Sequence, residues 1–340
     1  MSKEIVQRAN YIDAVKGLAI LCITFLHFED GVIPQWLYVW TGMFMISAFY
    51  FTSGWVTGIQ DKKITTKEFL KKRIKQLGIP YLWFSVIIIT FDILLVFVGW
   101  MEEKILLREI FKTVTLRGIG TLWFLPVLII GETIFCYIRN QKHKILIGIP
   151  GFLFTIFVAY CYFDIWNPLR ELSTTNKIID AFIQPTAKGI SSWPIIAIGY
   201  LFSKYVWNKI NTNKYILFFT GIIIITFSIQ LIVAPPFKIY YVNSILSNFL
   251  PAFGFICLFA ICKNNNYINR FFIYWGVNSL VLMCTHYSIT EEIFKIFNAN
   301  VLHKEFNGWI TILYFILTII LTYPMVTLFN GKLKFMLGKK

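Results

Sequence analysis

Two side chains that could do chemistry lie in one apolar stretch near the start of the sequence, YIDAVKGLAILCITFLHFED. Lys16 supplies a cation, and His27 supplies an imidazole, the side chain that titrates nearest to neutral pH. In an α-helix the step between them rotates the chain by about 1100°, close to three full turns, and lifts it by ~16 Å. Both side chains are therefore predicted to share one helix face. Lys16 would hold a charged donor at one end, and His27 would act towards the other.

Each of these residues also has a purely structural interpretation. Asp13 lies three positions before Lys16, so a local ion pair could account for both charges. A lone histidine such as His27 is commonly a hydrogen-bonded core residue. An ion pair would not exclude ligand binding, and the shared face of Lys16 and His27 favours a functional role.

Three further ionisable residues fall inside apolar runs, where they are expected to face the protein interior. For Asp92 and Glu132, hydrogen bonding between helices is the favoured interpretation. His286 is the second candidate for imidazole chemistry. The two other histidines, His143 and His303, fall in predicted connections and are expected to be solvated.

Composition indicates an integral membrane protein. Hydrophobic residues make up 57% of the chain and charged residues 14%, and the mean hydropathy is +0.66; soluble domains carry about 25% charged residues. The net charge of +15 does not indicate nucleic acid, because the basic residues lie between apolar runs, where anionic lipid and topology explain them. The six cysteines form no CxxC pair or Cys/His cluster, so no metal site is predicted.

Apolar segments predict an all-α fold, a polytopic membrane helical bundle with about ten transmembrane helices. Inner connections would carry 21 basic residues and outer ones ten, which places both termini in the cytoplasm. The first apolar run lacks a signal-peptide cleavage site and is expected to remain. A single domain is predicted over residues 1–340. The predicted spans are 14–28, 36–57, 78–100, 120–138, 145–163, 191–207, 215–234, 242–262, 271–290 and 308–330.

The segment DKKITTKEFLKKRIKQLGIPY, before the third predicted span, combines helical apolar spacing with a dense basic face. That pattern is typical of a helix on the membrane surface, attracted by anionic headgroups. Alternatively, Lys71, Lys72, Arg73 and Lys75 grip a phosphorylated ligand beside Lys16. Both interpretations are compatible. The outer connections 101–119 and 164–190 are of mixed charge and could form a lid or an acceptor groove.

The first helix resembles the start of the acyltransferase 3 family of integral-membrane bacterial O-acyltransferases. That family opens with an Asp, then a basic residue followed by Gly, a small residue and an apolar run, with His eleven positions after the basic residue. The matching residues here are Asp13, Lys16, Gly17, Ala19 and His27.

Later segments extend this resemblance over essentially the whole chain. FYFTSGW, with Ser53 and Gly54, is similar to the Phe-rich Ser-Gly element of the family's second span. Arg73 followed by Pro-Tyr is similar to its basic R-x-x-R segment, and a WFL element begins at Trp123. His286 follows an apolar run near the end, as in family members.

Two positions depart from the family pattern. Gln76 stands where the second Arg of R-x-x-R would fall, so that anion contact passes to Lys75 or is weaker. Thr121 occupies a position where relatives of this short type often have His. The short form of the family, without the fused hydrolase-like domain that longer relatives carry, is the form expected here.

The resemblance implies transfer of an acyl group, usually acetyl, from cytoplasmic acyl-CoA to a hydroxyl of a cell-surface polysaccharide or its lipid-linked precursor. Acetyl-CoA would be a co-substrate, with no bound cofactor. The protein would be located in the bacterial plasma membrane. The implied donor-binding residues are Lys16, Arg73, Lys72 and Lys75; His27 would be the general base or a transient acyl carrier, with Asp13, Ser53, Trp123 and His286 in support.

A carrier is the competing function class, because a ten-helix protein with a polar interior could flip or export a glycan without any chemistry. Transporters often contain repeated halves and broken helices. The sequence shows no internal repeat, which favours the acyltransferase. A non-catalytic lipid-binding or sensory protein is a weaker alternative.

Overall fold

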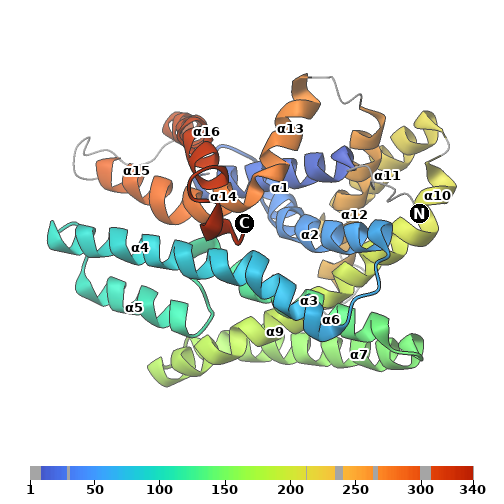
Figure 1. Ribbon diagram of the computed structural model, residues 1–340, viewed down its shortest axis with the longest axis horizontal. Coiled ribbons are helices and arrows are strands. Elements are labelled where there is room, and N and C mark those ends of the chain that lie inside the picture. The colour runs from blue at the N-terminus through green and yellow to red at the C-terminus, as the bar shows by residue number, and fades with distance from the viewer. Residues whose placement is uncertain are drawn as a thin grey trace. The chain divides into compact units, whose positions relative to one another are not determined.

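The computed structural model describes residues 9–28, 31–211, 213–233, 240–262, 267–298 and 308–339. All regular structure in these ranges is helical (Figure 1), which confirms the predicted all-α class. Seven segments among them are long and apolar enough to cross a membrane. These are Asn10–Phe28, Thr66–Phe97, Gly120–Asn140, Lys144–Arg170, Lys214–Val233, Tyr241–Ile261 and Gly308–Asn330. The chain is thus a membrane protein, while the count of ten spans and the orientation remain predictions.

The other three predicted spans are not among these seven segments, because their helices are less apolar or are interrupted. The span 36–57 matches α2 (Gln35–Gln60), a helix of 26 residues whose Trp, Tyr, Ser, Thr and Gly content lowers its hydropathy. The span 191–207 covers the end of α9 (Thr174–Leu201), a π-helical turn and α10 (Trp207–Ile210). The span 271–290 is interrupted after α13 (Tyr267–Val277).

The described chain divides into two compact units, each built from separate stretches of sequence. The first unit contains residues 9–23, 36–63 and 194–279. Its helices are the first part of α1 (Asn10–Phe28), α2, the end of α9, α10, α11 (Lys214–Val233), α12 (Tyr240–Ile261) and α13. The helices α11 and α12 pack against each other, and Trp40 of α2 donates a hydrogen bond to the Ser228 hydroxyl of α11 at 3.0 Å.

Aromatic side chains fill the core of the first unit. Phe51 and Trp55 of α2 meet Phe249 and Phe253 of α12 at ring distances of 6.0 to 6.3 Å. Phe202 completes the cluster, edge-on to Phe253 at 4.8 Å. Such pairs contribute beyond the area they bury, so the Phe-rich element of α2 is a packing surface.

Glycines allow two pairs of helices in the first unit to approach closely. A Cβ at Gly17 of α1 would lie 1.8 Å from the Phe272 carbonyl oxygen of α13. A Cβ at Gly54 of α2 would lie 1.8 Å from the Ile196 carbonyl oxygen of α9. Small residues at such contacts let backbones pack in the absence of a strong hydrophobic driving force. Gly54 is therefore a packing contact between α2 and α9.

The second unit contains residues 24–28, 31–35, 64–193 and 280–339 of the described chain. The basic segment forms α3, whose start is fixed by a capping box between Thr65 and Glu68. In Figure 1, α4 and α5 lie side by side, as do α7 and α9, where Trp193 donates to the Thr155 hydroxyl at 2.8 Å. The α-helices of this unit, besides the end of α1 and most of α9, are α3 (Thr66–Arg73), α4 (Ile79–Phe97), α5 (Glu103–Val114), α6 (Phe124–Asn140), α7 (Lys144–Ala159), α8 (Asn167–Arg170), α14 (Ser279–Thr285), α15 (Glu292–Phe297) and α16 (Gly308–Asn330).

Short 3₁₀ and π-helical turns connect several of these helices. They are η1 (Ile74–Gly78), η2 (Gly120–Trp123), η3 (Tyr160–Trp166), η5 (His286–Glu291) and η7 (Lys334–Leu337) in the second unit and η4 (Phe202–Val206) in the first. Single π-helical turns are rare in proteins, and those that occur are often found at functional sites. The turn η5 begins at His286, one of the two histidines in apolar sequence.

Candidate active site

A polar cavity of about 630 Å³ lies within the second unit and contains His27 in its wall. Its volume falls in the usual range of small-molecule sites. The walls come from the end of α1, from α4, α5, η2, α9, η5 and α15, and from the two loops around α5. The lining residues are His27, Ile88, Asp92, Trp100, Met101, Glu102, Ile105, Arg108, Glu109, Lys112, Arg117, Gly118, Ile119, Gly120, Thr121, Trp123, Gln184, Lys188, Tyr287, Ser288 and Glu292.

His27 stands beside two residues of the turn η5. Its ring centroid is 4.6 Å from that of Tyr287 and 5.2 Å from that of His286. His286 is completely buried, and its Nδ1 lies 2.7 Å from the Leu282 carbonyl oxygen. Nδ1 must carry the proton to donate there, which leaves Nε2 as an acceptor without a hydrogen-bond partner among the described residues. The structure thus brings together the two histidines singled out by sequence.

Local hydrogen bonds hold η5 in place. The Thr290 hydroxyl donates to the His286 carbonyl at 2.8 Å, and the Thr121 hydroxyl donates to the Met283 carbonyl of α14. Thr121 stands where histidine was expected from related sequences. Its described contact is structural, because it ties η2 to α14, the helix that ends at Thr285, just before His286.

The loop before η2 needs glycine to reach the cavity wall. Gly118 and Gly120 have φ of 73° and 50°, a region that favours glycine. A Cβ at Gly120 would lie 2.4 Å from both the Tyr287 ring and the Ser288 hydroxyl. Trp123, three residues after Gly120, lines the same cavity as His27.

One side of the cavity is basic. The Lys188 ammonium lies over the Trp123 ring, 4.4 Å from its centroid. Arg117 Nε donates to Gln184 Oε1 at 2.8 Å, and Gln184 precedes Lys188 by one helical turn of α9. Burial, followed by the nearby charges of Arg117 and Arg170, lowers the pKa of Lys188 to about 8.

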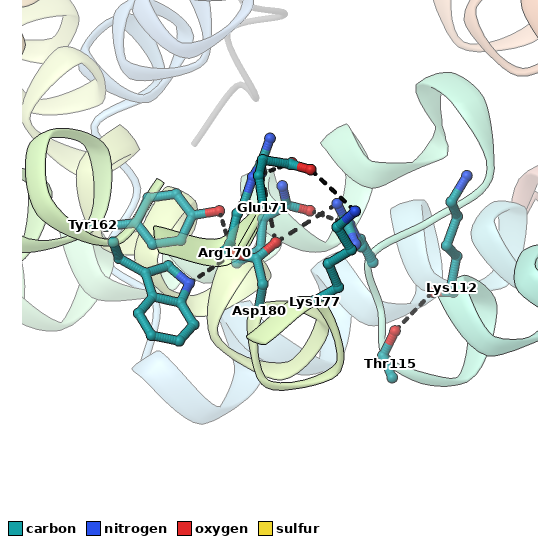
Figure 2. A network of polar contacts seen from close by, with 10 residues as sticks. Lys112, Thr115, Tyr162, Arg170, Glu171, Lys177 and Asp180 are labelled. Atoms are coloured by element: carbon teal, nitrogen blue, oxygen red, sulfur yellow. Dashed lines mark hydrogen bonds and ion pairs between the residues drawn. The ribbon is translucent and has the colours of Figure 1, made fainter. Parts of the chain in front are cut away.

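Behind this side lies a completely buried carboxylate, Asp180 (Figure 2). Its Oδ1 accepts hydrogen bonds from the Tyr162 hydroxyl at 3.1 Å and from Trp166 Nε1 at 3.0 Å. Its Oδ2 lies 3.6 Å from the guanidinium groups of both Arg117 and Arg170. Asp180 therefore pairs by charge with both Arg117 and Arg170, while the two hydrogen bonds it accepts are at Oδ1.

The opposite charge gathers on α4, α5 and α15. Asp92, Glu109 and Glu292 all line the cavity, and Lys112 binds both carboxylate oxygens of Glu109 at 2.8 and 3.1 Å. No hydrogen bond of the Asp92 carboxylate to another helix is present in the described part of the chain. Asp92 instead faces the cavity, where it can contact a ligand.

Arg73 forms the strongest polar contact of α3. Its Nε and Nη2 lie 2.7 and 2.8 Å from the two carboxylate oxygens of Glu132 on α6, and Nη1 donates to Gln76 at 3.0 Å. The expected contact of Glu132 with another helix is confirmed. Lys72 and Lys75, in contrast, are exposed. Any ligand phosphate at Arg73 would have to share it with Glu132.

Three of the residues selected by sequence lie in the first unit. Asp13 is buried and Lys16 half-buried in α1, and Ser53 is half-buried in α2. The helix α1 runs unbroken from Asn10 to Phe28, as the common face of Lys16 and His27 requires. His303 lies outside the described residues, and His143 is exposed before α7.

Several cavity residues were not singled out by sequence. Arg117 and Lys188 enter the sequence analysis only as charges of outer connections. Asp180 and Tyr287 do not enter it. The signal that could have found Asp180 is its place among the apolar residues of α9, between Ile179 and Ala181. The partners of Arg117 lie more than 60 positions away, with Gln184 at a separation of 67, so no local pattern reveals them.

The arrangement suits acid–base or nucleophilic chemistry of a histidine on a polar ligand. In the described ranges, no group of three His, Cys, Asp or Glu side chains could hold a metal ion. The cavity provides an imidazole, carboxylates that can accept from hydroxyl groups, and cations for an anion. This set of side chains fits proton transfer from a sugar-like hydroxyl.

Comparison with known proteins gives one match. No curated protein and no solved structure matches the chain. The family model described as an acyltransferase domain, acyltransferase 3, matches residues 9–329. That match covers α1 with Lys16 and His27, every wall of the cavity and all but the end of α16. The chain belongs to the acyltransferase 3 family.

Proposed function

We propose that this membrane protein transfers an acetyl group from cytoplasmic acetyl-CoA to a hydroxyl of a cell-surface polysaccharide or its lipid-linked precursor. It would work in the bacterial plasma membrane, with no bound cofactor. The observation that carries the proposal is the position of His27: an imidazole in the wall of a polar cavity, in a chain of an acyltransferase family.

His27 is the general base in this proposal. A hydroxyl is a weak nucleophile at neutral pH, so the imidazole accepts its proton while the oxygen attacks the thioester carbonyl. The carbon–sulfur bond breaks, and the CoA thiolate leaves and is protonated. Two routes account for the bonds that form and break: direct transfer of the acetyl group to the acceptor hydroxyl, or transfer first to a ring nitrogen of His27 and then to the hydroxyl.

His286 and Trp123 support His27 in this scheme. The buried His286 ring packs beside His27, and Trp123 shares its cavity wall. Ser53 and Asp13 belong to the other unit, where Asp13 and Gly17 of α1 meet α13. Their proposed roles are to shape the donor path and to hold Lys16.

Positive side chains bind the CoA phosphates. Lys16, Lys72 and Lys75 serve as point charges, and Arg73 contributes a fork that is already aligned by Glu132. Lys72 and Lys75 are exposed at the surface of this segment, whereas Arg73 is paired with Glu132.

The test is the substitution His27→Ala in the purified full chain. A positioned imidazole contributes about 10² to 10⁴-fold to proton transfer, so acetyl transfer should fall by that factor. Labelled acetyl-CoA with a panel of glycans measures the transfer, and equilibrium binding of acetyl-CoA should stay within about twofold.

The matched control is His143→Ala, which removes an exposed imidazole in a connection. It should retain wild-type transfer. Near-native transfer by a folded His27→Ala protein would contradict the proposed base and direct attention to His286. A wild-type protein that moves glycan across vesicles without consuming acetyl-CoA would contradict the enzyme and support a carrier.

A further inference from the structure

The basic side of the cavity holds more positive charge than its surroundings compensate. Four basic and four acidic side chains line the cavity, but they are not evenly paired. Lys112 and Arg108 both contact Glu109, at 2.8 and 3.3 Å. Those two cations share one negative charge within α5. On the other side of the cavity, Arg117, Arg170 and Lys188 gather around the single carboxylate of Asp180.

Arg117 shares its only ion-pair partner in the described chain. Asp180 Oδ2 lies at the same 3.6 Å from Arg117 and from Arg170. Its other oxygen is engaged by Tyr162 and Trp166. One carboxylate thus balances the charge of two guanidinium groups, and a third cation nearby forms no ion pair with it in the described chain.

Lys188 is that third cation, and it faces the cavity. Within the described residues it makes no hydrogen bond and no ion pair, and its ammonium rests on the Trp123 ring. Lys188 is half-buried, and a partly desolvated cation in a cavity wall without an ion-pair partner gains from a ligand that brings a negative charge. The lowered pKa of Lys188 has the same origin, burial together with the charges of Arg117 and Arg170.

We propose that Lys188 and Arg117 bind an anionic group, a carboxylate or a phosphate, carried by the acyl acceptor. The acceptor is then an acidic glycan, charged either on its sugar or on the phosphate that links it to a carrier. Its reacting hydroxyl lies at His27, in the same cavity. Guanidinium and ammonium groups on one wall suit such anions. This inference rests on the proposed acyl transfer, because it assigns the acceptor of that reaction.

Three small probes of similar size test the inference: methyl glucuronide, glucose 1-phosphate and methyl glucoside. Binding to the full chain in nanodiscs is measured by ligand-observed NMR titration without acetyl-CoA, and acetyl transfer is measured separately. The better anionic probe should bind at least about 10-fold more tightly than methyl glucoside, because it gains charge-assisted hydrogen bonds. Which of the two gains more identifies the source of the anion.

Substitutions assign that preference to the site. Lys188→Gln should abolish it without changing the affinity for methyl glucoside, and Lys188→Arg should largely restore it. Lys177→Gln, an exposed lysine on the same helix, is the matched control and should keep the preference. A preference that survives Lys188→Gln would overturn the inference. So would a loss of acetyl-CoA affinity with unchanged probe binding, which would assign the cations to the donor.

The two measurements separate this inference from the proposed function. Binding of an anionic probe that depends on Lys188, without acetyl transfer to any acceptor, would uphold the anion site and refute the acyltransferase. Acetyl transfer at equal efficiency to charged and neutral probes would uphold the acyltransferase and refute the anion site.

Discussion

His27 and His286 differ in their surroundings, and this difference separates their roles. His27 lines the cavity, while His286 has no exposed surface and is anchored through Nδ1 to the carbonyl one turn before it. A ring without solvent access cannot meet a bulky glycan. We therefore propose that His286 is a positioning residue, whose ring orients that of His27 beside it.

The substitution His286→Phe tests this role. The new ring is aromatic but larger than an imidazole and cannot donate to the Leu282 carbonyl, so the neighbour that orients His27 is changed. We expect kcat for acetyl transfer to fall at least about 10-fold, with KM for acetyl-CoA within about twofold. Steady-state kinetics on the solubilised protein measure both values.

The conservative variant His286→Gln serves as the rescue, because its amide can donate and accept hydrogen bonds. It should recover part of kcat. Wild-type kcat in His286→Phe would show that the buried ring is only a packing element.

At the scale of single elements, the segment 61–78 shows what a local pattern predicts and what it omits. The basic face and the start of α3 follow from sequence, since the capping box at Thr65 and Glu68 is a local signature. The partner of Arg73 does not, because Glu132 lies 59 positions away. Arg73 is therefore a structural contact as well as a candidate phosphate ligand.

Arg73 and Lys72 should consequently respond differently to substitution. Arg73→Gln leaves the nearly buried Glu132 carboxylate without its cation and should lower the free energy of unfolding by on the order of 3 kcal/mol. Lys72→Gln should leave stability unchanged and weaken acetyl-CoA binding by an amount that shrinks at high salt. Thermal unfolding and binding at two salt concentrations distinguish the effects.

Lys16→Ala belongs to the same comparison and should weaken acetyl-CoA binding more than acceptor binding. Unchanged acetyl-CoA affinity in both Lys16→Ala and Arg73→Gln would reject the donor site.

Helix packing in the first unit gives a sharper structural prediction. Gly54→Ala would place a methyl group 1.8 Å from the Ile196 carbonyl, so α2 and α9 would have to separate. We expect a loss of folded protein or a fall in melting temperature of many degrees, measured by fluorescence-detected size exclusion after heating.

Gly42→Ala is the control on the same helix, because a Cβ there meets nothing within 4 Å. It should be neutral or slightly stabilising, since Ala is favoured over Gly in a helix by about 0.5–1 kcal/mol. Equal behaviour of the two variants would show that the contact at Gly54 is not tight.

At the scale of the whole molecule, the properties that sequence predicted are those that depend on neighbours along the chain. Hydropathy and length identify helices directly, and Lys16 with His27 could be found because both lie on one helix. The cavity could not be predicted, because its walls come from segments as distant as His27 and Glu292. The basic side was hidden for a second reason: Arg117 and Lys188 fall in predicted connections, where charged residues are common.

The arrangement across the membrane follows from charge asymmetry and makes the last prediction. With 21 basic residues on predicted inner segments and ten on outer ones, Lys142, Lys332 and Cys262 should lie at the cytoplasmic side and Lys104 at the outer side. All four side chains are exposed, so cysteines at these positions are accessible to reagents. Four proteins with one cysteine each serve as reporters. One keeps Cys262 as its sole native cysteine, and the other three carry Lys142→Cys, Lys332→Cys or Lys104→Cys in a background without native cysteines. A membrane-impermeant maleimide added to intact spheroplasts should label only Lys104→Cys, and inverted vesicles should reverse the pattern. Labelling of Lys332→Cys from outside would remove the C-terminus from the cytoplasm and require an odd number of spans.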